Sequence, residues 1–285
     1  MKDNKFVLSI VGIGGMGNWH RELINEEKID GLIVKGAFDI KSERLDFAKS
    51  KGLVAYNSLD ELLNDDEVDI VLCATPNDVH KEIVIKALNA KKNVVCEKPV
   101  CMNMEELQEM IYTANKNKKL FTVHQNRRWD ADFLTIKKIF DEKMLGEVFN
   151  VECRVHGSRG IPGDWRGEKE HGGGMILDWG VHIIDQVLMM YQQKVKSLFC
   201  TLTNVTNEIV DDGFKLFLTF KDSKTALLEV GTSNFIELPK WYLQGVNGTA
   251  IIDDWYLNGR IKCITNWDKN DAVPIKTAAG LTKTM

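Results

Sequence analysis

The stretch FVLSIVGIGGMG, residues 6–17, joins a nearly unbroken apolar run to glycines in the pattern G-x-G-x-x-G. A short apolar run bounded by glycine is typical of a buried strand. Gly12 permits a tight turn, Gly14 lets the backbone approach a pyrophosphate, and Gly17 lets the following helix pack closely on the strand. The start of that helix offers free N–H groups to phosphates. The stretch therefore predicts a dinucleotide-binding unit.

A second apolar run, Leu32–Phe38, ends at Asp39. A carboxylate in this place accepts hydrogen bonds from both ribose hydroxyls and repels a 2′-phosphate, so Asp39 favours NAD over NADP. Lys41, Ser42 and Arg44 follow directly and could cradle such a phosphate, which keeps NADP possible. The alternative is a glycine turn in a non-binding domain, with Asp39 as a surface charge.

The rest of the first 125 residues repeats the alternation of strand and helix. Further apolar runs lie at 70–74, 94–96 and 120–123, and helical spacing lies at 58–64, 79–89 and 104–115. Nearly unbroken apolar strands separated by helices are typical of a parallel sheet covered on both faces. The sequence predicts an α/β protein whose residues 1–125 form a dinucleotide-binding Rossmann domain with a doubly wound parallel sheet.

The pattern changes beyond residue 125. Helices are expected at 130–145 and 174–191, and strands at 147–156, 214–220, 225–232 and 240–246. Alternating apolar and polar residues indicate strands with one wet face, and Asn247-Gly248 is a strong hairpin signal. Residues 126–285 are therefore predicted to form a substrate-binding and oligomerisation α/β domain with a large, mostly antiparallel open sheet.

Composition narrows the class of protein. The chain has 285 residues, 44% of them hydrophobic and 27% charged, with a net charge of −4. These values are typical of globular proteins, and the lack of a basic excess argues against a nucleic-acid partner. No apolar run approaches ~20 residues, so no membrane span is expected. Six cysteines without a C-x-x-C pair fit reduced thiols in a cytoplasmic protein, with Cys101 the candidate for a reactive one.

Three further motifs follow in order: ATPNDVH at 74–80, VCEKP at 95–99 and GGGMILDWGVH at 172–182. Together with the glycine pattern they resemble the Gfo/Idh/MocA oxidoreductase family over nearly the whole chain. HQNRRWD at 124–130 looks like the branch that contains scyllo-inositol dehydrogenases. The resemblance implies reversible oxidation of a sugar or cyclitol hydroxyl by NAD or NADP. Family chains usually continue into helical segments, so a C-terminal tail is expected to be missing here.

The motifs assign candidate residues to the cofactor. The expected cofactor-binding set is Gly12, Ile13, Gly14, Gly15, Met16, Gly17, Asp39, Thr75, Pro76, Asn77, His80, Glu97, Lys98 and Asn126. Glu97 is expected to orient Lys98 or the nicotinamide ribose rather than to react.

Lys98, Asp178 and His182 are the candidate catalytic residues. Lys98 lies just past the carboxyl end of a parallel strand, where ligands bind in doubly wound folds. Asp178 and His182 are four apart and share a helix face, which Asp185 joins. His182 is expected to titrate near neutrality and relay a proton, while Asp178 fixes substrate hydroxyls or the imidazole tautomer. A solvated lysine, a plain polar stripe and a metal site are the alternatives; no metal is expected.

The substrate is expected to contact Arg127, Trp165 and Arg166, as well as Asp178 and His182. Trp165 and Arg166 lie in a glycine-rich loop, where an aromatic face and a guanidinium suit a sugar ring. The triple glycine at 172–174 would let the helix that follows approach the cofactor closely.

Three functions remain open from the sequence. The first is an NAD(P)-dependent sugar or polyol dehydrogenase with Lys98 and His182 as acid and base. An NAD-assisted glycoside hydrolase and a cofactor-sensing regulator without chemistry are the alternatives. The expected partners are a small sugar or polyol and a second copy of the chain, in a homodimer or homotetramer through the C-terminal sheet.

Overall fold

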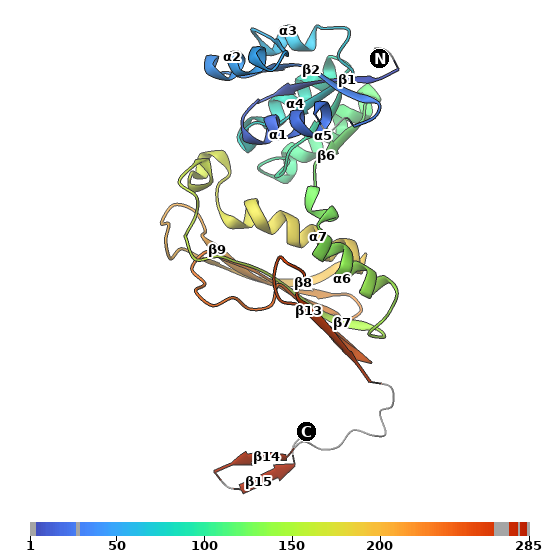
Figure 1. Ribbon diagram of the computed structural model, residues 1–285, viewed down its shortest axis with the longest axis vertical. Coiled ribbons are helices and arrows are strands. Elements are labelled where there is room, and N and C mark those ends of the chain that lie inside the picture. Colours follow the sequence, from blue (N-terminus) through green and yellow to red (C-terminus); the bar gives the residue numbers. More distant parts are fainter. Residues whose placement is uncertain (1–3, 27–28, 265–273, 279, 284–285) are drawn as a thin grey trace.

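The computed structural model describes residues 4–26, 29–264, 274–278 and 280–283, and its two large sheets lie one beyond the other along the molecule (Figure 1). The elements of the first part are β1 (Phe6–Val11), α1 (Gly15–Asn25), β2 (Leu32–Phe38), α2 (Ser42–Ser50), β3 (Val54–Ala55), α3 (Leu59–Leu63), β4 (Ile70–Cys73), η1 (Asn77–Val79), α4 (His80–Asn89), β5 (Asn93–Cys96), α5 (Met104–Asn117) and β6 (Phe121–Val123).

The first sheet has the strand order β3-β2-β1-β4-β5-β6, and every pair of neighbours is parallel. This confirms the predicted doubly wound sheet. The order reverses between β1 and β4, so a crevice for a ligand is expected at the carboxyl ends of these strands. The two-residue strand β3 is too short to leave a pattern in the sequence, and it was not predicted.

Apolar side chains cover both faces of this sheet. On one face Val71 and Cys73 of β4 pack with Val84 of α4 and Met110 of α5. On the other face Leu72 packs in a second cluster that includes residues of β1, α1 and α2. Burial on both sides explains why the strands read as unbroken apolar runs.

The second part contains η2 (Asn126–Trp129), α6 (Ala131–Asp141), β7 (Val148–His156), η3 (Trp165–Gly167), η4 (Lys169–His171), η5 (Ile176–Gly180), α7 (Val181–Tyr191), β8 (Val195–Thr203), β9 (Gly213–Phe220), β10 (Thr225–Gly231), β11 (Trp241–Gly245), β12 (Gly248–Ile252) and β13 (Gly259–Cys263). A separate pair, β14 (Pro274–Thr277) and β15 (Gly280–Lys283), is antiparallel.

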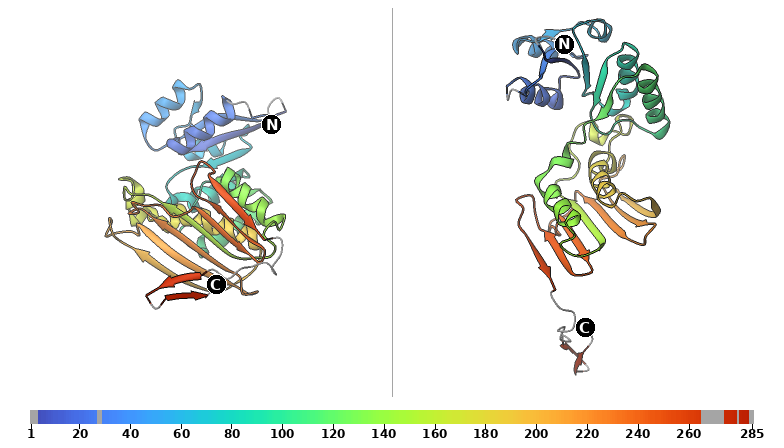
Figure 2. Two further views of the ribbon diagram at one scale, coloured as in Figure 1. Left: turned by 60° about the horizontal axis from the view of Figure 1, so that its bottom comes forward. Right: turned by 90° about the vertical axis from the view of Figure 1, so that its right-hand side faces the viewer.

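The second sheet has the order β13-β12-β11-β7-β10-β9-β8. Only the neighbours β7 and β10 are parallel, which confirms the predicted mostly antiparallel sheet. The hairpin expected at Asn247-Gly248 joins β11 to β12. Helices α6 and α7 cover the face turned toward the first sheet, and among the described residues no helix covers the opposite face (Figures 1 and 2).

A buried polar group joins α6 to this sheet. Asp132 accepts hydrogen bonds from the Trp241 indole at 2.7 Å and pairs with the Lys240 ammonium at 2.6 Å. The surrounding core is apolar and includes Phe133 and Val187. Within the described residues, no helix is both long enough and apolar enough to cross a lipid bilayer.

Candidate active site

The glycine loop between β1 and α1 packs tightly against its neighbours. Gly12 has a φ of +88°, and a Cβ there would lie 2.6 Å from the carbonyl oxygen of Ala74. A Cβ on Gly17 would lie 2.1 Å from the oxygen of Gly12. Among the residues that the structure describes, no side chain caps the start of α1 at Gly14, and a Cβ on Gly15 would meet nothing within 4 Å. The helix end is therefore open to an anionic pyrophosphate.

Asp39 and Arg44 both contact the backbone of Ile13 in this loop. Asp39 Oδ2 accepts a hydrogen bond from the Ile13 amide at 2.9 Å, and Oδ1 accepts one from the Lys41 amide at 3.0 Å. Arg44 Nη1 donates to the Ile13 carbonyl at 3.3 Å. A carboxylate and a guanidinium thus both lie beside the glycine loop, where they would contact the ribose of a cofactor and its substituents.

The turn after β4 contains two buried side chains that contact backbone carbonyl groups. The ring of His80 is fully buried, with Nδ1 3.0 Å from the Pro99 carbonyl oxygen and Nε2 2.9 Å from that of Thr75. Asn77 is also buried and donates to the Gly172 carbonyl at 3.2 Å. Both were predicted to bind cofactor directly, whereas this arrangement favours a positioning role. Thr75 remains partly exposed.

Glu97 lies beneath the site between two imidazoles. Its Oε1 is 2.7 Å from His20 Nε2 and 2.9 Å from His124 Nδ1, distances that indicate direct hydrogen bonds. Although burial by itself raises it, the contacts with His124 and His20 lower the pKa of Glu97 to about 2. Its Oε2 accepts a hydrogen bond from the Lys98 amide at 3.2 Å. Glu97 thus connects His20 of α1 and His124, which follows β6, to the backbone of Lys98.

Lys98 and Asp178 form a partly buried ion pair across the two parts of the chain. Lys98 Nζ lies 2.9 Å from Asp178 Oδ1 and donates to the Asp178 carbonyl at 3.1 Å. Arg166 Nε donates to the other carboxylate oxygen at 3.1 Å, and its Nη1 pairs with Asp164 at 2.7 Å. Burial alone would raise the pKa of Asp178, but Lys98 and Arg166 hold it below its usual value. Asp178 is therefore an anion between two cations.

The backbone that carries Asp178 differs from the predicted single α-helix over 174–191. Residues Ile176–Gly180 form a π-helical turn, and α7 begins only after it. Such turns occur often at functional sites because they re-aim one side chain. Asp185, which was expected on the face of Asp178, instead pairs with Arg128 at 2.6 and 2.7 Å.

His182 is a neutral imidazole, which corrects the prediction that it titrates near neutrality. Burial, followed by the positive charges of Lys98 and Arg127, lowers its pKa to about 3. Its Nδ1–H donates to Gln125 Oε1 at 3.2 Å, which leaves the lone pair on Nε2. Gln125 was not predicted as a site residue, since nothing in the sequence pairs it with His182.

A pocket of about 400 Å³ adjoins these residues and is lined in part by Arg127, His156, Trp179, Thr232 and Trp255. The Arg127 guanidinium lies 4.0 Å from the centre of the Trp179 ring, which is 5.7 Å from that of Trp255. The aromatic wall is therefore not built from Trp165, which stacks with Arg166 at 4.7 Å. Nothing in the sequence distinguished Trp179 or Trp255 from a tryptophan of the hydrophobic core.

Asn126 supplies an independent sign of a ligand. Its Oδ1 is buried and has no hydrogen-bond partner among the described residues. A buried acceptor without a donor is costly, so this oxygen suits a ligand hydroxyl or amide. With the uncapped start of α1 and the open space at Gly15, the residues present fit a bound dinucleotide.

Comparisons with known proteins agree with this geometry. The model of an oxidoreductase family with an NAD-binding Rossmann fold, GFO_IDH_MocA, matches residues 6–125, and the model of the Gfo/Idh/MocA C-terminal domain matches residues 133–251. A crystal structure of an NAD-binding protein from Listeria innocua is 52% identical, with a TM-score of 0.94, over 99% of this chain and 81% of that one.

Curated relatives are more distant. An uncharacterized oxidoreductase of Schizosaccharomyces pombe is 39% identical over 59% of this chain and 47% of its own length. The scyllo-inositol 2-dehydrogenase (NADP(+)) of Bacillus subtilis is 28% identical over 86% of this chain and 68% of its own length. The chain thus spans about half the length of the first of these relatives.

Proposed function

This chain belongs to the Gfo/Idh/MocA family of NAD-binding oxidoreductases, and on that premise we propose that it oxidises and reduces a secondary hydroxyl of a sugar or cyclitol. The observation that carries the proposal is the Lys98–Asp178 pair beside the neutral imidazole of His182. An ammonium and an unprotonated imidazole in one partly buried site can hold an oxygen and receive its proton.

The cofactor would be held by the glycine loop, Asp39 and Asn126. The nicotinamide, when bound, supplies the acceptor for the hydride of the carbinol carbon. Asp178 directs the Lys98 side chain into the site. The Lys98 ammonium then hydrogen-bonds the reacting oxygen and stabilises its developing negative charge.

His182 receives the hydroxyl proton in this scheme. Its Nδ1–H is committed to Gln125, so Nε2 is the atom that accepts. A proton placed there is close to the positive charges of Lys98 and Arg127, which favour its release again. In the reverse direction Nε2 returns a proton to the oxygen, so both directions use the same atoms.

The pocket beside the site supports a sugar or cyclitol as substrate. The faces of Trp179 and Trp255 suit the C–H faces of a saturated ring, and Arg127 suits its hydroxyls. The relative from Bacillus subtilis is named for scyllo-inositol, a ring of this kind.

Growth of the NADH absorbance band tests the proposal, with NAD or NADP and a panel of inositols and aldoses. We expect one polyol to be oxidised, and we expect Lys98→Ala and His182→Ala each to lower kcat at least about 100-fold while cofactor binding persists. Lys86→Ala is the control, because that lysine is exposed and pairs with the exposed Glu82. Normal turnover in both site variants would defeat the assignment.

We also propose that the second sheet mediates self-association. On the face away from the helices, its strands β8 and β9 expose the apolar side chains of Phe199 and Phe217, which are partners in the register. Exposed apolar side chains on a sheet face without helices favour a partner surface, and a second copy supplies one. Light scattering should give a dimer or tetramer, and Phe199→Lys should shift it toward monomer. A monomeric parent chain would contradict this proposal.

A further inference from the structure

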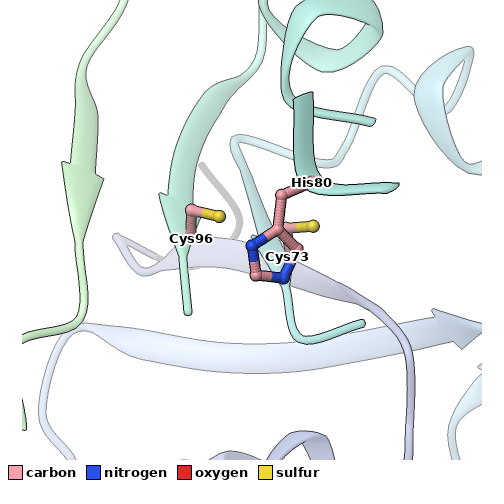
Figure 3. Close-up of side chains that lie close together, drawn as sticks. All are labelled: Cys73, His80 and Cys96. Atoms are coloured by element: carbon pink, nitrogen blue, oxygen red, sulfur yellow. The ribbon is translucent and has the colours of Figure 1, made fainter. Parts of the chain in front are cut away.

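Two cysteines end neighbouring strands of the first sheet. Cys73 closes β4 and Cys96 closes β5, and the two are direct partners in the parallel register. Paired strands lie about 4.8 Å apart, which is within the Cα separation that a disulfide spans. The ring of His80 lies beside Cys73, with Cys96 on the neighbouring strand (Figure 3), and the two sulfur atoms and one ring nitrogen lie within 4.8 Å of one another.

The contacts of His80 determine what this cluster can do. Both of its ring nitrogens face carbonyl oxygens, those of Pro99 and Thr75. Neither nitrogen is therefore free to ligate a metal.

Cys73 Sγ lies 3.5 Å from the Thr75 hydroxyl oxygen and beside the Cys96 thiol. Burial alone would raise the pKa of Cys73, but the hydrogen bond from Cys96 and the charge of His80 lower it. The same hydrogen bond and burial raise the pKa of Cys96. Of the two thiols, Cys73 therefore has the lower pKa and is the better nucleophile.

We propose that Cys73 and Cys96 form a peroxide-sensitive pair that closes to a disulfide. The Cys73 sulfur attacks one oxygen of hydrogen peroxide as the thiol gives up its proton, the O–O bond breaks, and the departing hydroxide takes that proton to become water. The resulting sulfenic acid is attacked by the Cys96 sulfur. The S–S bond forms as the S–O bond breaks, and the leaving hydroxyl departs as water with the Cys96 proton. Two electrons pass from the thiols to the peroxide.

The place of the pair connects it to the cofactor site. Cys73 immediately precedes Ala74, against which the glycine loop packs at Gly12. Cys96 immediately precedes Glu97, which accepts from the Lys98 amide. Drawing the two sulfurs to bonding distance shifts both segments, so the oxidised form should bind NAD more weakly and recover with dithiothreitol.

The test treats the full chain with hydrogen peroxide, quenches it with an alkylating agent and maps the peptides by mass spectrometry. Cys153 is the internal control, because it is fully buried too, but burial raises its pKa. We expect a linked Cys73–Cys96 peptide that forms at least about tenfold faster than Cys153 oxidises. Equal rates would mean that unfolding exposes all thiols, and a different first pair, or stoichiometric zinc in the purified protein, would also overturn the proposal.

Two variants separate the steps. In Cys96→Ser the sulfenic acid on Cys73 should persist and be captured by dimedone. In Cys73→Ser the remaining Cys96 should give no adduct. Equal labelling of the two variants would show that Cys73 is not the attacking atom. The peptide map of the wild-type protein needs neither these variants nor an activity measurement. It therefore tests the disulfide even if the proposed dehydrogenase function is wrong.

Discussion

Lys98 Nζ and Asp178 Oδ1 lie 2.9 Å apart although 80 residues separate them in the chain. Lys98 follows the carboxyl end of β5 in the first sheet, and Asp178 lies in the π-helical turn that packs on the second. Neither part contains this pair by itself. The proposed acid–base chemistry therefore depends on the contact between the two parts, which the buried hydrogen bond from Asn77 to Gly172 also supports.

Asp178→Asn removes the charge that holds Lys98. We expect kcat to fall about 100- to 1,000-fold, because the ammonium loses its fixed direction, while NAD binding changes little. Steady-state rates and a separate cofactor titration measure this. Asp164→Asn is the matched control, since Asp164 contacts Arg166 but not Lys98. Equal losses in the two variants would assign the effect to the loop rather than to the ion pair.

Much of the fold follows from local pattern. The strands of the first sheet are buried on both faces, so each appears as an apolar run whose end coincides with a motif residue such as Asp39 or Glu97. The hairpin at Asn247-Gly248 is likewise set by local backbone preference. The π-helical turn was not predictable in this way, because its apolar spacing fits an α-helix equally well.

The site was predicted less completely, for a physical reason. Lys98, Asp178 and His182 belong to motifs, but their partners lie on other elements. His20 meets Glu97 across 77 residues, and Gln125 meets His182 across 57. Such pairs depend on tertiary packing, which periodicity does not encode. Arg166 contacts Asp178, and its expected contact with the substrate stays a prediction.

Acid should destabilise the protein through His182. Its pKa in the folded chain is about 3, below the ordinary value near 6.5. Between these values the unfolded chain binds a proton that the folded chain lacks, so stability rises with pH and falls on acidification. Urea unfolding at several pH values from 6.5 down to 4.5 should show His182→Gln losing less stability than the parent, by about 1 kcal/mol per pH unit. Parallel curves for the two proteins would exclude a buried neutral imidazole.

Asp39→Ser should relax cofactor preference. The carboxylate that repels a 2′-phosphate is removed, and Arg44 is left beside the glycine loop. We expect NAD affinity to fall about tenfold and NADP affinity to rise by a similar factor. Dissociation constants for both cofactors measure this. Adding Arg44→Ala should abolish the gain for NADP, whereas an unchanged ratio in Asp39→Ser would show that discrimination lies elsewhere.

Gly173→Ala should disturb the site through the backbone of the loop. A Cβ on Gly173 would lie 2.3 Å from the Arg166 carbonyl oxygen and 2.8 Å from that of Glu168. Gly173 therefore lets the loop pack closely against its own backbone. From the sequence, the triple glycine was expected to let the following helix approach the cofactor, which is a different contact. Backbone atoms cannot yield cheaply, so we expect a loss of about 1–3 kcal/mol in the free energy of unfolding. Turnover should also fall, because Arg166 holds Asp178. Gly163→Ala, whose Cβ would meet nothing within 4 Å, should change neither quantity, and a similar loss in both variants would contradict the argument.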